Sequence, residues 1–280
     1  MRKPGIIALD LDGTLLNSEK ILTPENEAAL RRAAEEGIEI VPATGRFYRG
    51  MPECIRDLPY VHYAITINGA EVTDVRRKTA LVRAELPTGT AIRVMEELDR
   101  LPVIYDCYAD GWGYMTRALY EKAAEYAPTR HNLDMILNLR TPVPELKAYL
   151  RETGYGVQKI QAFFLDQDLR KRTMENLAAL FPDTAVSTSI VNNIEINSRT
   201  AQKGFALRSL AEAIGVDPAD TMAFGDDLND LSMIEAAGTG VAMANGAGEV
   251  REKADYVAPS CDENGVAAAL ADLLWRKEDA

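Results

Sequence analysis

The chain has 280 residues, of which 47% are hydrophobic and 26% charged, a composition typical of a globular protein large enough for two domains. Its formal net charge of −12 excludes an overall basic field, so we expect neither nucleic acid nor an anionic membrane as a partner. Three widely spaced cysteines without a C-x-x-C pair predict no disulfide framework and no zinc site, and they favour a cytoplasmic location.

The first apolar run, Gly5–Leu9, is typical of a strand buried on both faces of a parallel sheet. Asp10 and Asp12 follow it directly, and on an extended backbone residues i and i+2 point to the same side, about 6.5 Å apart. Two carboxylates this close need a bound cation or a shared proton. An ordinary turn needs only one short polar residue, and the spacing to Gly13 does not fit a calcium loop. We therefore predict a catalytic site here.

A helix and a second strand come next in the chain. Thr23-Pro24-Glu25 is typical of a helix start, and Gly37 is typical of its end. Ile38–Val41 is then predicted to be a strand, which makes a right-handed parallel crossover with the first. Thr44 and Gly45 follow this strand, so we expect them at the same sheet edge as Asp10.

The pattern changes after a third apolar run, Tyr63–Ile67, and a hairpin that reaches about Leu86. The next stretch mixes helical and strand patterns, and Asp110-Gly111 predicts a tight turn within it. Helices are predicted at 88–100, 144–152 and 167–180, and strands at 103–108, 112–116, 135–139 and 157–165. We interpret 87–188 as an inserted α+β domain that selects the substrate, and 1–86 with 189–280 as the catalytic core.

The strand and helix alternation of the core resumes after the insertion, which predicts an α/β fold with a parallel sheet. The predicted elements are strands at 194–196, 221–224, 239–243 and 256–257, and helices from about 203 to 214, 247–253 and 266–275. The strand at 221–224 ends in Gly225–Asp230, a segment that holds three acids and one amide within five residues.

This acidic segment opens a helix, where one carboxylate would suffice as a cap. Asp226, Asp227 and Asp230 exceed that need, and together with Asp10 and Asp12 they form a hard-oxygen site suited to Mg²⁺. A Lys at a helix start is often only a solvated side chain, but Lys203 would bring a positive charge to these acids. The Thr44 hydroxyl and the next amide could donate to a phosphoryl oxygen, or could simply form a turn.

These segments, taken in order, resemble the four motifs of the haloacid dehalogenase (HAD) superfamily phosphatases. The matching segments are Asp10-Leu11-Asp12-Gly13-Thr14, Thr44-Gly45-Arg46, Lys203-Gly204 and Gly225-Asp226-Asp227-Leu228-Asn229-Asp230. The position of the insertion, the Asn68-Gly69-Ala70 turn and the segment 240–245 resemble the Cof-like, type-IIB subgroup. The resemblance spans the whole chain and implies a Rossmann-like parallel-sheet core with an inserted α+β cap domain.

The resemblance also implies Mg²⁺-dependent hydrolysis of the phosphate monoesters of small metabolites such as sugar phosphates. Asp10 would be the nucleophile that forms an aspartyl-phosphate, and Asp12 the general acid and base. Mg²⁺ would be bound by Asp10, the Asp12 carbonyl and Asp226, with Asp230 supporting it directly or through its neighbours. Phosphoryl oxygens would be held by the Leu11 amide, Thr44, Gly45, Lys203 and Asn229. Asp227, where the family often has a small or neutral residue, would add negative charge beside the metal.

Two other functions are compatible with the same motifs. A phosphomutase would return the phosphoryl group to a sugar, but it needs a cluster of polar or basic cap residues, which the sequence does not identify. A sensor of phosphorylated ligands needs no nucleophile, and the Asp10 and Asp12 pair would oppose binding of an anion. The oligomeric state does not follow from the sequence.

Overall fold

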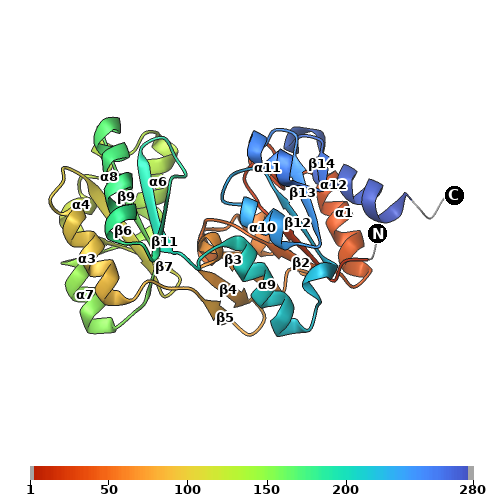
Figure 1. Cartoon of the computed structure of the whole chain (residues 1–280), viewed down its shortest axis with the longest axis horizontal. Coiled ribbons are helices and arrows are strands. Elements are labelled where there is room, and N and C mark those ends of the chain that lie inside the picture. The colour runs from red at the N-terminus through yellow and green to blue at the C-terminus, as the bar shows by residue number, and fades with distance from the viewer. Residues whose placement is uncertain (1–2, 277–280) are drawn as a thin grey trace. The chain divides into compact units, whose positions relative to one another are not determined.

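The computed structural model describes residues 3–276, which divide into two compact units. The first unit contains the chain up to Arg83 and again from Gln202, and the second unit is Ala84–Ala201. Figure 1 shows the elements of each unit. Within the described residues, no helix has the length and apolar character needed to cross a membrane.

The first unit is built on a five-stranded parallel sheet with the order β14-β13-β12-β1-β2. The strands are β1 (Ile6–Leu9), β2 (Glu39–Pro42), β12 (Thr221–Gly225), β13 (Thr239–Met243) and β14 (Tyr256–Ala258). Leu9 at the end of β1 pairs in register with Pro42 and Phe224 on the neighbouring strands. The segments that follow β1, β2 and β12 therefore begin at one edge of the sheet, as the sequence predicts.

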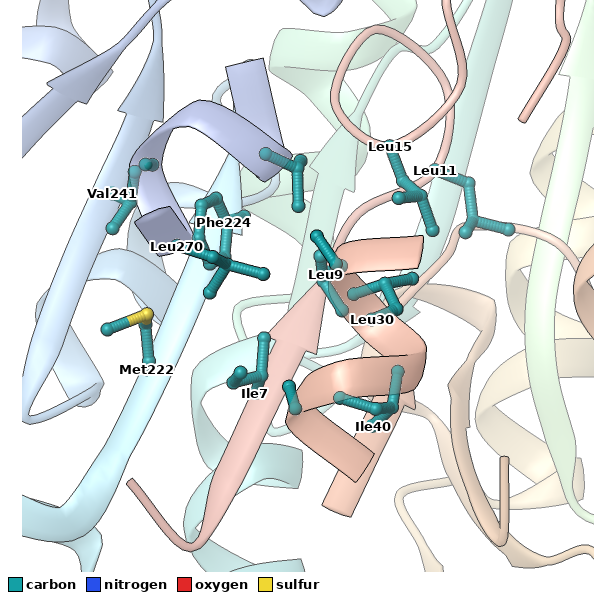
Figure 2. Packing of buried hydrophobic residues seen from close by; sticks show 14 of the residues in the cluster. Ile7, Leu9, Leu11, Leu15, Leu30, Ile40, Met222, Phe224, Val241 and Leu270 are labelled. Carbon is teal, nitrogen blue, oxygen red and sulfur yellow. The ribbon is translucent and has the colours of Figure 1, made fainter. Parts of the chain in front are cut away.

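Helices cover both faces of this sheet, which explains why its strands are continuous apolar runs. Ile7 and Leu9 pack with Leu30 of α1 (Pro24–Glu35) and Leu270 of α12 (Gly265–Leu270), as Figure 2 shows. Ile6 and Ala8 point to the opposite face, where they pack with residues of two other helices. Those helices are α9 (Lys203–Ile214) and α10 (Leu231–Ala236), and α11 (Gly248–Lys253) follows β13.

An antiparallel sheet of three strands follows the second parallel strand, in agreement with the predicted hairpin. It consists of β3 (Tyr63–Thr66), β4 (Glu71–Asp74) and β5 (Thr79–Arg83). Ala43 forms an isolated parallel bridge with Ile65, so β3 lies beside the segment that follows β2. The turn after β3 therefore starts close to Thr44, whose carbonyl accepts a hydrogen bond from the Asn68 amide at 3.0 Å.

The second unit has a six-stranded sheet with the order β10-β11-β9-β6-β7-β8. Its strands are β6 (Ile104–Ala109), β7 (Trp112–Thr116), β8 (Arg140–Val143), β9 (Val157–Phe163), β10 (Thr184–Ser187) and β11 (Asn193–Ser198). One face packs against α3 (Thr88–Leu98), α7 (Leu146–Thr153) and α8 (Gln167–Leu180). Asp110 and Gly111 both have positive φ angles, so the predicted tight turn between β6 and β7 is confirmed.

The predicted strand at 135–139 is wrong, because these residues end the helix α6 (Arg130–Leu139). The Thr129 side chain caps this helix by accepting a hydrogen bond from the Asn132 amide at 3.1 Å. A short apolar run does not by itself distinguish a strand from a buried helix segment. The strand begins one residue later, at Arg140, as β8.

The strand predicted at 194–196 was assigned to the core, but the structure places it in the second unit as β11. It pairs antiparallel with β9 and β10, and Ile194 and Ile196 pack in the core of that unit. The second unit therefore extends to Ala201 rather than to residue 188. The alternation of apolar and polar residues at 194–196 indicates a strand with one apolar and one polar face. It does not indicate which sheet the strand joins.

The sequence pattern does not predict several short elements. These are α2 (Glu53–Arg56), α4 (Arg117–Tyr120), α5 (Ala123–Tyr126), β8 and β10. The last predicted helix, 266–275, consists of α12 and a π-helical turn, Ala271–Trp275. Elements of four residues carry too little hydrophobic periodicity to be recognised from sequence.

Candidate active site

Four charged side chains from three separate segments meet at the carboxyl edge of the parallel sheet. Asp10 follows β1, Lys203 is the first residue of α9, and Asp226 and Asp230 follow β12. One carboxylate oxygen from each of the three acids lies within 4.8 Å of the others, close enough to hold a metal ion. We call these four residues the core cluster.

Lys203 links two acids of the core cluster. Its Nζ lies 2.5 Å from Asp10 Oδ1 and 2.6 Å from Asp230 Oδ1, and its side chain is fully buried. Burial alone would lower the pKa of Lys203, but the two carboxylates outweigh it and raise that pKa above its ordinary value. Lys203 therefore stays protonated and supplies the fixed positive charge that the sequence predicts.

Asp230 orients the loop around it. Its Oδ2 accepts hydrogen bonds from the amides of Asp226 at 3.0 Å and Asp227 at 3.1 Å, while its Oδ1 accepts from Lys203. A Cβ at Gly225 would lie 2.4 Å from the Asp230 Cβ, so only glycine fits at that position. Both oxygens of the fully buried Asp230 are engaged within the protein.

Asp226 is held against the loop that follows β1. Its Oδ1 accepts a hydrogen bond from Thr14 Oγ1 at 2.7 Å. Gly13 has a φ of 98°, and a Cβ there would lie 2.5 Å from Asp226 Oδ2. Burial raises the pKa of Asp226 to about 6, despite the hydrogen bond from Thr14.

Asp10 is the most perturbed acid of the core cluster. Burial raises its pKa to about 8, and the charges of Asp230 and Asp226 add to the rise, although Lys203 opposes it. With every group ionised, the core cluster carries a net charge of −2. Carboxylate oxygens are hard ligands, so the excess charge and the donor set together fit a divalent cation such as Mg²⁺.

Asp12 lies outside this group and is paired with two cations instead. Arg46 Nε and Nη2 lie 3.0 and 2.9 Å from its Oδ2, and Nη2 also lies 3.1 Å from its Oδ1. Lys20 Nζ lies 3.0 Å from Oδ1. Partial burial favours the protonated acid, but Arg46 and Lys20 outweigh it and hold the pKa of Asp12 below its usual range.

Thr44 and Gly45 lie at the end of β2, beside the turn after β3. The buried Thr44 Oγ1 accepts a hydrogen bond from the Arg46 amide at 3.2 Å. A Cβ at Gly45 would lie 2.9 Å from Asn68 Oδ1, which also accepts a hydrogen bond from Asn229 Nδ2 at 3.3 Å. Asn68 thus connects the segment after β2 with the segment after β12.

Leu11 and Asp227 are the two remaining residues of the predicted site, and their side chains lie in different surroundings. The Leu11 side chain is buried in the hydrophobic core, so only its backbone is available to a ligand. Asp227 is exposed, and its Oδ1 accepts a hydrogen bond from the Leu228 amide at 2.8 Å. Asp227 therefore caps the turn and does not belong to the core cluster.

Five residues around the core cluster have no role predicted from the sequence: Thr14, Lys20, Arg46, Asn68 and Asn245. Asn245 Nδ2 donates to the Gly13 carbonyl at 2.8 Å, and its Oδ1 accepts from the Cys261 amide at 2.9 Å. Four of the five lie within quoted motif segments, which is the signal that could have identified them. No such signal marks Lys20, because a lysine in a polar turn is usually solvated.

Comparison with known proteins identifies the family. A family model described as haloacid dehalogenase-like hydrolase matches residues 7–270. The chain is 30% identical to 5-amino-6-(5-phospho-D-ribitylamino)uracil phosphatase YcsE of Bacillus subtilis, over 95% of this chain and 94% of that protein. It is 32% identical to pyridoxal phosphate phosphatase YbhA of Escherichia coli, over 90% of this chain and 92% of that protein.

Solved structures agree with this assignment. A haloacid dehalogenase-like hydrolase from Bacteroides thetaiotaomicron superimposes with a TM-score of 0.82 at 27% identity, covering 97% of this chain and all of that one. The predicted α/β fold, a parallel-sheet core with a cap domain, is confirmed. The chain therefore belongs to the haloacid dehalogenase-like hydrolases and is a Cof-like phosphatase, an enzyme that acts on phosphoric monoesters.

Proposed function

We propose that this enzyme is a Mg²⁺-dependent phosphatase that hydrolyses the phosphate monoesters of small metabolites through an aspartyl-phosphate. The observation that carries the proposal is the core cluster, in which buried Lys203 holds Asp10 at 2.5 Å beside Asp226 and Asp230. A nucleophilic carboxylate beside a fixed cation and a cation site is the arrangement that phosphoryl transfer requires.

Asp10 would act as the nucleophile. One of its carboxylate oxygens forms a bond to phosphorus while the bond from phosphorus to the leaving oxygen breaks. In its protonated form Asp12 gives a proton to that leaving oxygen. As the carboxylate, the form that Arg46 and Lys20 favour, it then accepts one from the water that attacks the aspartyl-phosphate and regenerates Asp10. The ion pair with Lys203 keeps the Asp10 carboxylate in one orientation through both steps.

The metal would be held by Asp10, Asp226 and the backbone carbonyl of Asp12. When bound, Mg²⁺ supplies positive charge that lets the anionic nucleophile and the anionic phosphate approach each other. Asp230 would orient Lys203 and the loop, because both of its oxygens are already engaged. Asp227 would contribute only its charge nearby.

The phosphoryl oxygens would be bound by groups from three strand ends. These are the Leu11 amide, Thr44, Gly45, Lys203 and Asn229. Asn68 supports this arrangement, because it contacts Asn229 and lies against Gly45. Donors fixed in this way stabilise the charge that moves between oxygens in the transition state.

The substrate would be a sugar phosphate or a similar small metabolite. The two relatives carry names for a phosphorylated ribitylaminouracil and for pyridoxal phosphate, so the family accepts different leaving groups. We propose that the second unit is the cap that selects among them. The three cysteines are free, which fits a reducing compartment, and we propose that the enzyme acts in the cytoplasm.

The test is phosphate release from a panel of phosphate monoesters, with and without Mg²⁺. The wild type should release phosphate only with Mg²⁺, and Asp10→Asn should lose roughly 10⁴-fold or more because the covalent route is gone. Asp57→Asn is the control, since Asp57 is a surface acid paired with Arg56. Full activity in Asp10→Asn would refute the mechanism. Isomerisation of a sugar bisphosphate without release would favour a mutase, and tight binding without turnover a sensor.

A further inference from the structure

The Asp12 carboxylate is held by two cations that differ in geometry. Arg46 contacts both of its oxygens through Nε and Nη2, at 2.9 to 3.1 Å. Lys20 contacts only Oδ1, at 3.0 Å, from a side chain that is 57% exposed. A forked guanidinium defines both the position and the plane of a carboxylate, whereas an ammonium acts as a point charge.

Arg46 is itself anchored. Its amide donates to Thr44 Oγ1 at 3.2 Å, and its carbonyl accepts from the Ile67 amide at 2.9 Å. Its side chain is 24% exposed, less than half as much as that of Lys20. Arg46 is thus tied to the end of β2 and to the turn after β3, so it can transmit the rigidity of the sheet edge to Asp12.

Lys20 has less support. It lies in the turn that starts at Asn17, with a φ of 63°. Exposed single-point ion pairs contribute little, because solvent screens them and a long side chain loses entropy on pairing. Both cations therefore place a positive charge beside the Asp12 carboxylate, but only Arg46 also fixes its orientation.

We propose that Arg46 is the positioning residue that fixes the Asp12 carboxylate for proton transfer to the leaving oxygen, and that Lys20 contributes little to that step. The inference rests on the proposed function, which assigns the proton transfer to Asp12. Arg46 acts through Asp12 and need not touch the substrate.

The effect of losing Arg46 should depend on how basic the leaving group of the substrate is. An alkyl phosphate such as a sugar phosphate releases a strongly basic alkoxide, which needs a proton as the bond breaks. p-Nitrophenyl phosphate releases a stable phenolate that needs none. Loss of a correctly placed Asp12 should therefore slow formation of the aspartyl-phosphate far more from the alkyl substrate than from the aryl substrate, whereas its hydrolysis is common to both.

The experiment measures kcat and KM of wild type, Arg46→Ala, Arg46→Lys and Lys20→Ala on p-nitrophenyl phosphate and on one sugar phosphate that the wild type hydrolyses. Arg46→Ala should lose about 10²-fold or more in kcat/KM on the sugar phosphate but less than about 10-fold on the aryl substrate, because kcat/KM covers only the steps up to loss of the leaving group. Arg46→Lys should restore little, because lysine lacks the fork. Lys20→Ala should stay within about 3-fold on both substrates. Retained aryl phosphatase activity shows that the variants fold.

A double-mutant cycle separates positioning from direct binding. In an Asp12→Asn background, Arg46→Ala should add less than about a 3-fold loss, since there is no proton transfer left to position. Equal losses in kcat/KM on the two substrates, or losses that multiply in the double variant, would overturn the inference while leaving the proposed function intact. A wild type that releases no phosphate from either substrate would overturn both.

Discussion

Each unit of this protein buries a cluster of four charged residues, and the two clusters differ in charge balance. The core cluster holds three acids and Lys203. The second, which we call the cap cluster, crosses the six-stranded sheet and consists of Asp106, Arg140, Lys159 and Glu195. With every group ionised, its two acids and two bases cancel, whereas the core cluster carries a net charge of −2.

The cap cluster balances its charges internally, although Asp106 Oδ1 is buried without a hydrogen-bond partner among the described residues. Arg140 Nε lies 2.8 Å from Asp106 Oδ2, and Lys159 Nζ lies 3.0 Å from Glu195 Oε1. Tyr108 lies between the two pairs, with the Arg140 guanidinium 4.6 Å and the Lys159 ammonium 4.8 Å from its ring centre. A balanced cluster of this kind helps to specify one sheet pairing, although burial of its charges makes it a weak source of net stability.

The core cluster cannot satisfy its charges in the same way. The pKa of Asp10 rises to about 8 and that of Asp226 to about 6, which means that both acids resist ionisation without a cation. Burial raises the pKa of Asp106 as well, so the two clusters differ in charge balance and not in the direction of this shift. Buried charge alone therefore does not indicate a functional site. Unbalanced buried charge does, because it creates a demand for an ion that the protein does not supply.

The largest expected effect on stability comes from breaking the cap cluster. Asp106→Ala leaves Arg140 buried without its acid, which should cost about 3–5 kcal/mol in the free energy of unfolding of the second unit. Hydrogen exchange in β6 and β9 during urea titration measures it. Asp134→Ala removes an exposed pair with Arg130 and should cost less than about 1 kcal/mol. Equal costs would show that burial of the pair is unimportant.

Mg²⁺ should stabilise only the first unit. At a hundredfold excess over Kd, a ligand that binds only the folded state adds about 2.7 kcal/mol, which a rise in Tm after EDTA treatment and Mg²⁺ addition would reveal. Asp226→Asn should abolish the rise, and Asp106→Ala should preserve it. A rise that persists in Asp226→Asn would place the ion elsewhere.

Two glycines with positive φ angles test the geometry around Asp226. Gly37→Ala should cost only backbone strain, about 1 kcal/mol, because nothing lies within 4 Å of the added Cβ. Gly13→Ala should cost about 1 kcal/mol more and also reduce the Mg²⁺-induced rise in Tm, because its Cβ would displace the Asp226 carboxylate. Identical thermal shifts in both variants would argue against this contact.

The smallest effect concerns pH. In metal-free protein the raised pKa values of Asp10 and Asp226 mean that the folded state keeps protons which the unfolded chain releases above pH 4. The contribution of these acids to stability is therefore present at low pH and falls as the pH rises toward 8. Mg²⁺ competes with these protons, so its stabilising effect should grow from pH 5 to pH 8 by at least about 1 kcal/mol. Thermal melts at several pH values measure it, and an unchanged Mg²⁺ effect would contradict the assignment.

Most of the core could be predicted because its signals are local. Gly5–Leu9 and Thr221–Phe224 are apolar runs, and the acids that follow them mark strand ends that parallel pairing brings to one edge. The contact of Lys203 with the acids does not follow from this rule, because Lys203 begins α9 after a strand of the second unit. Local sequence was not sufficient in two places. At 135–139 the apolar run does not distinguish a helix from a strand, and at β11 the pattern does not indicate which sheet the strand joins.

Hydrophobic runs and chain direction specify the succession of strands and helices along the core and the set of acids that gathers at one sheet edge. The contacts of Arg46 and Lys20 with Asp12, and of Arg140 with Asp106, arise only when the chain folds. The partners in these pairs are 34, 8 and 34 positions apart. No local pattern encodes such pairs, because they depend on where loops and strands pack once the hydrophobic core has formed.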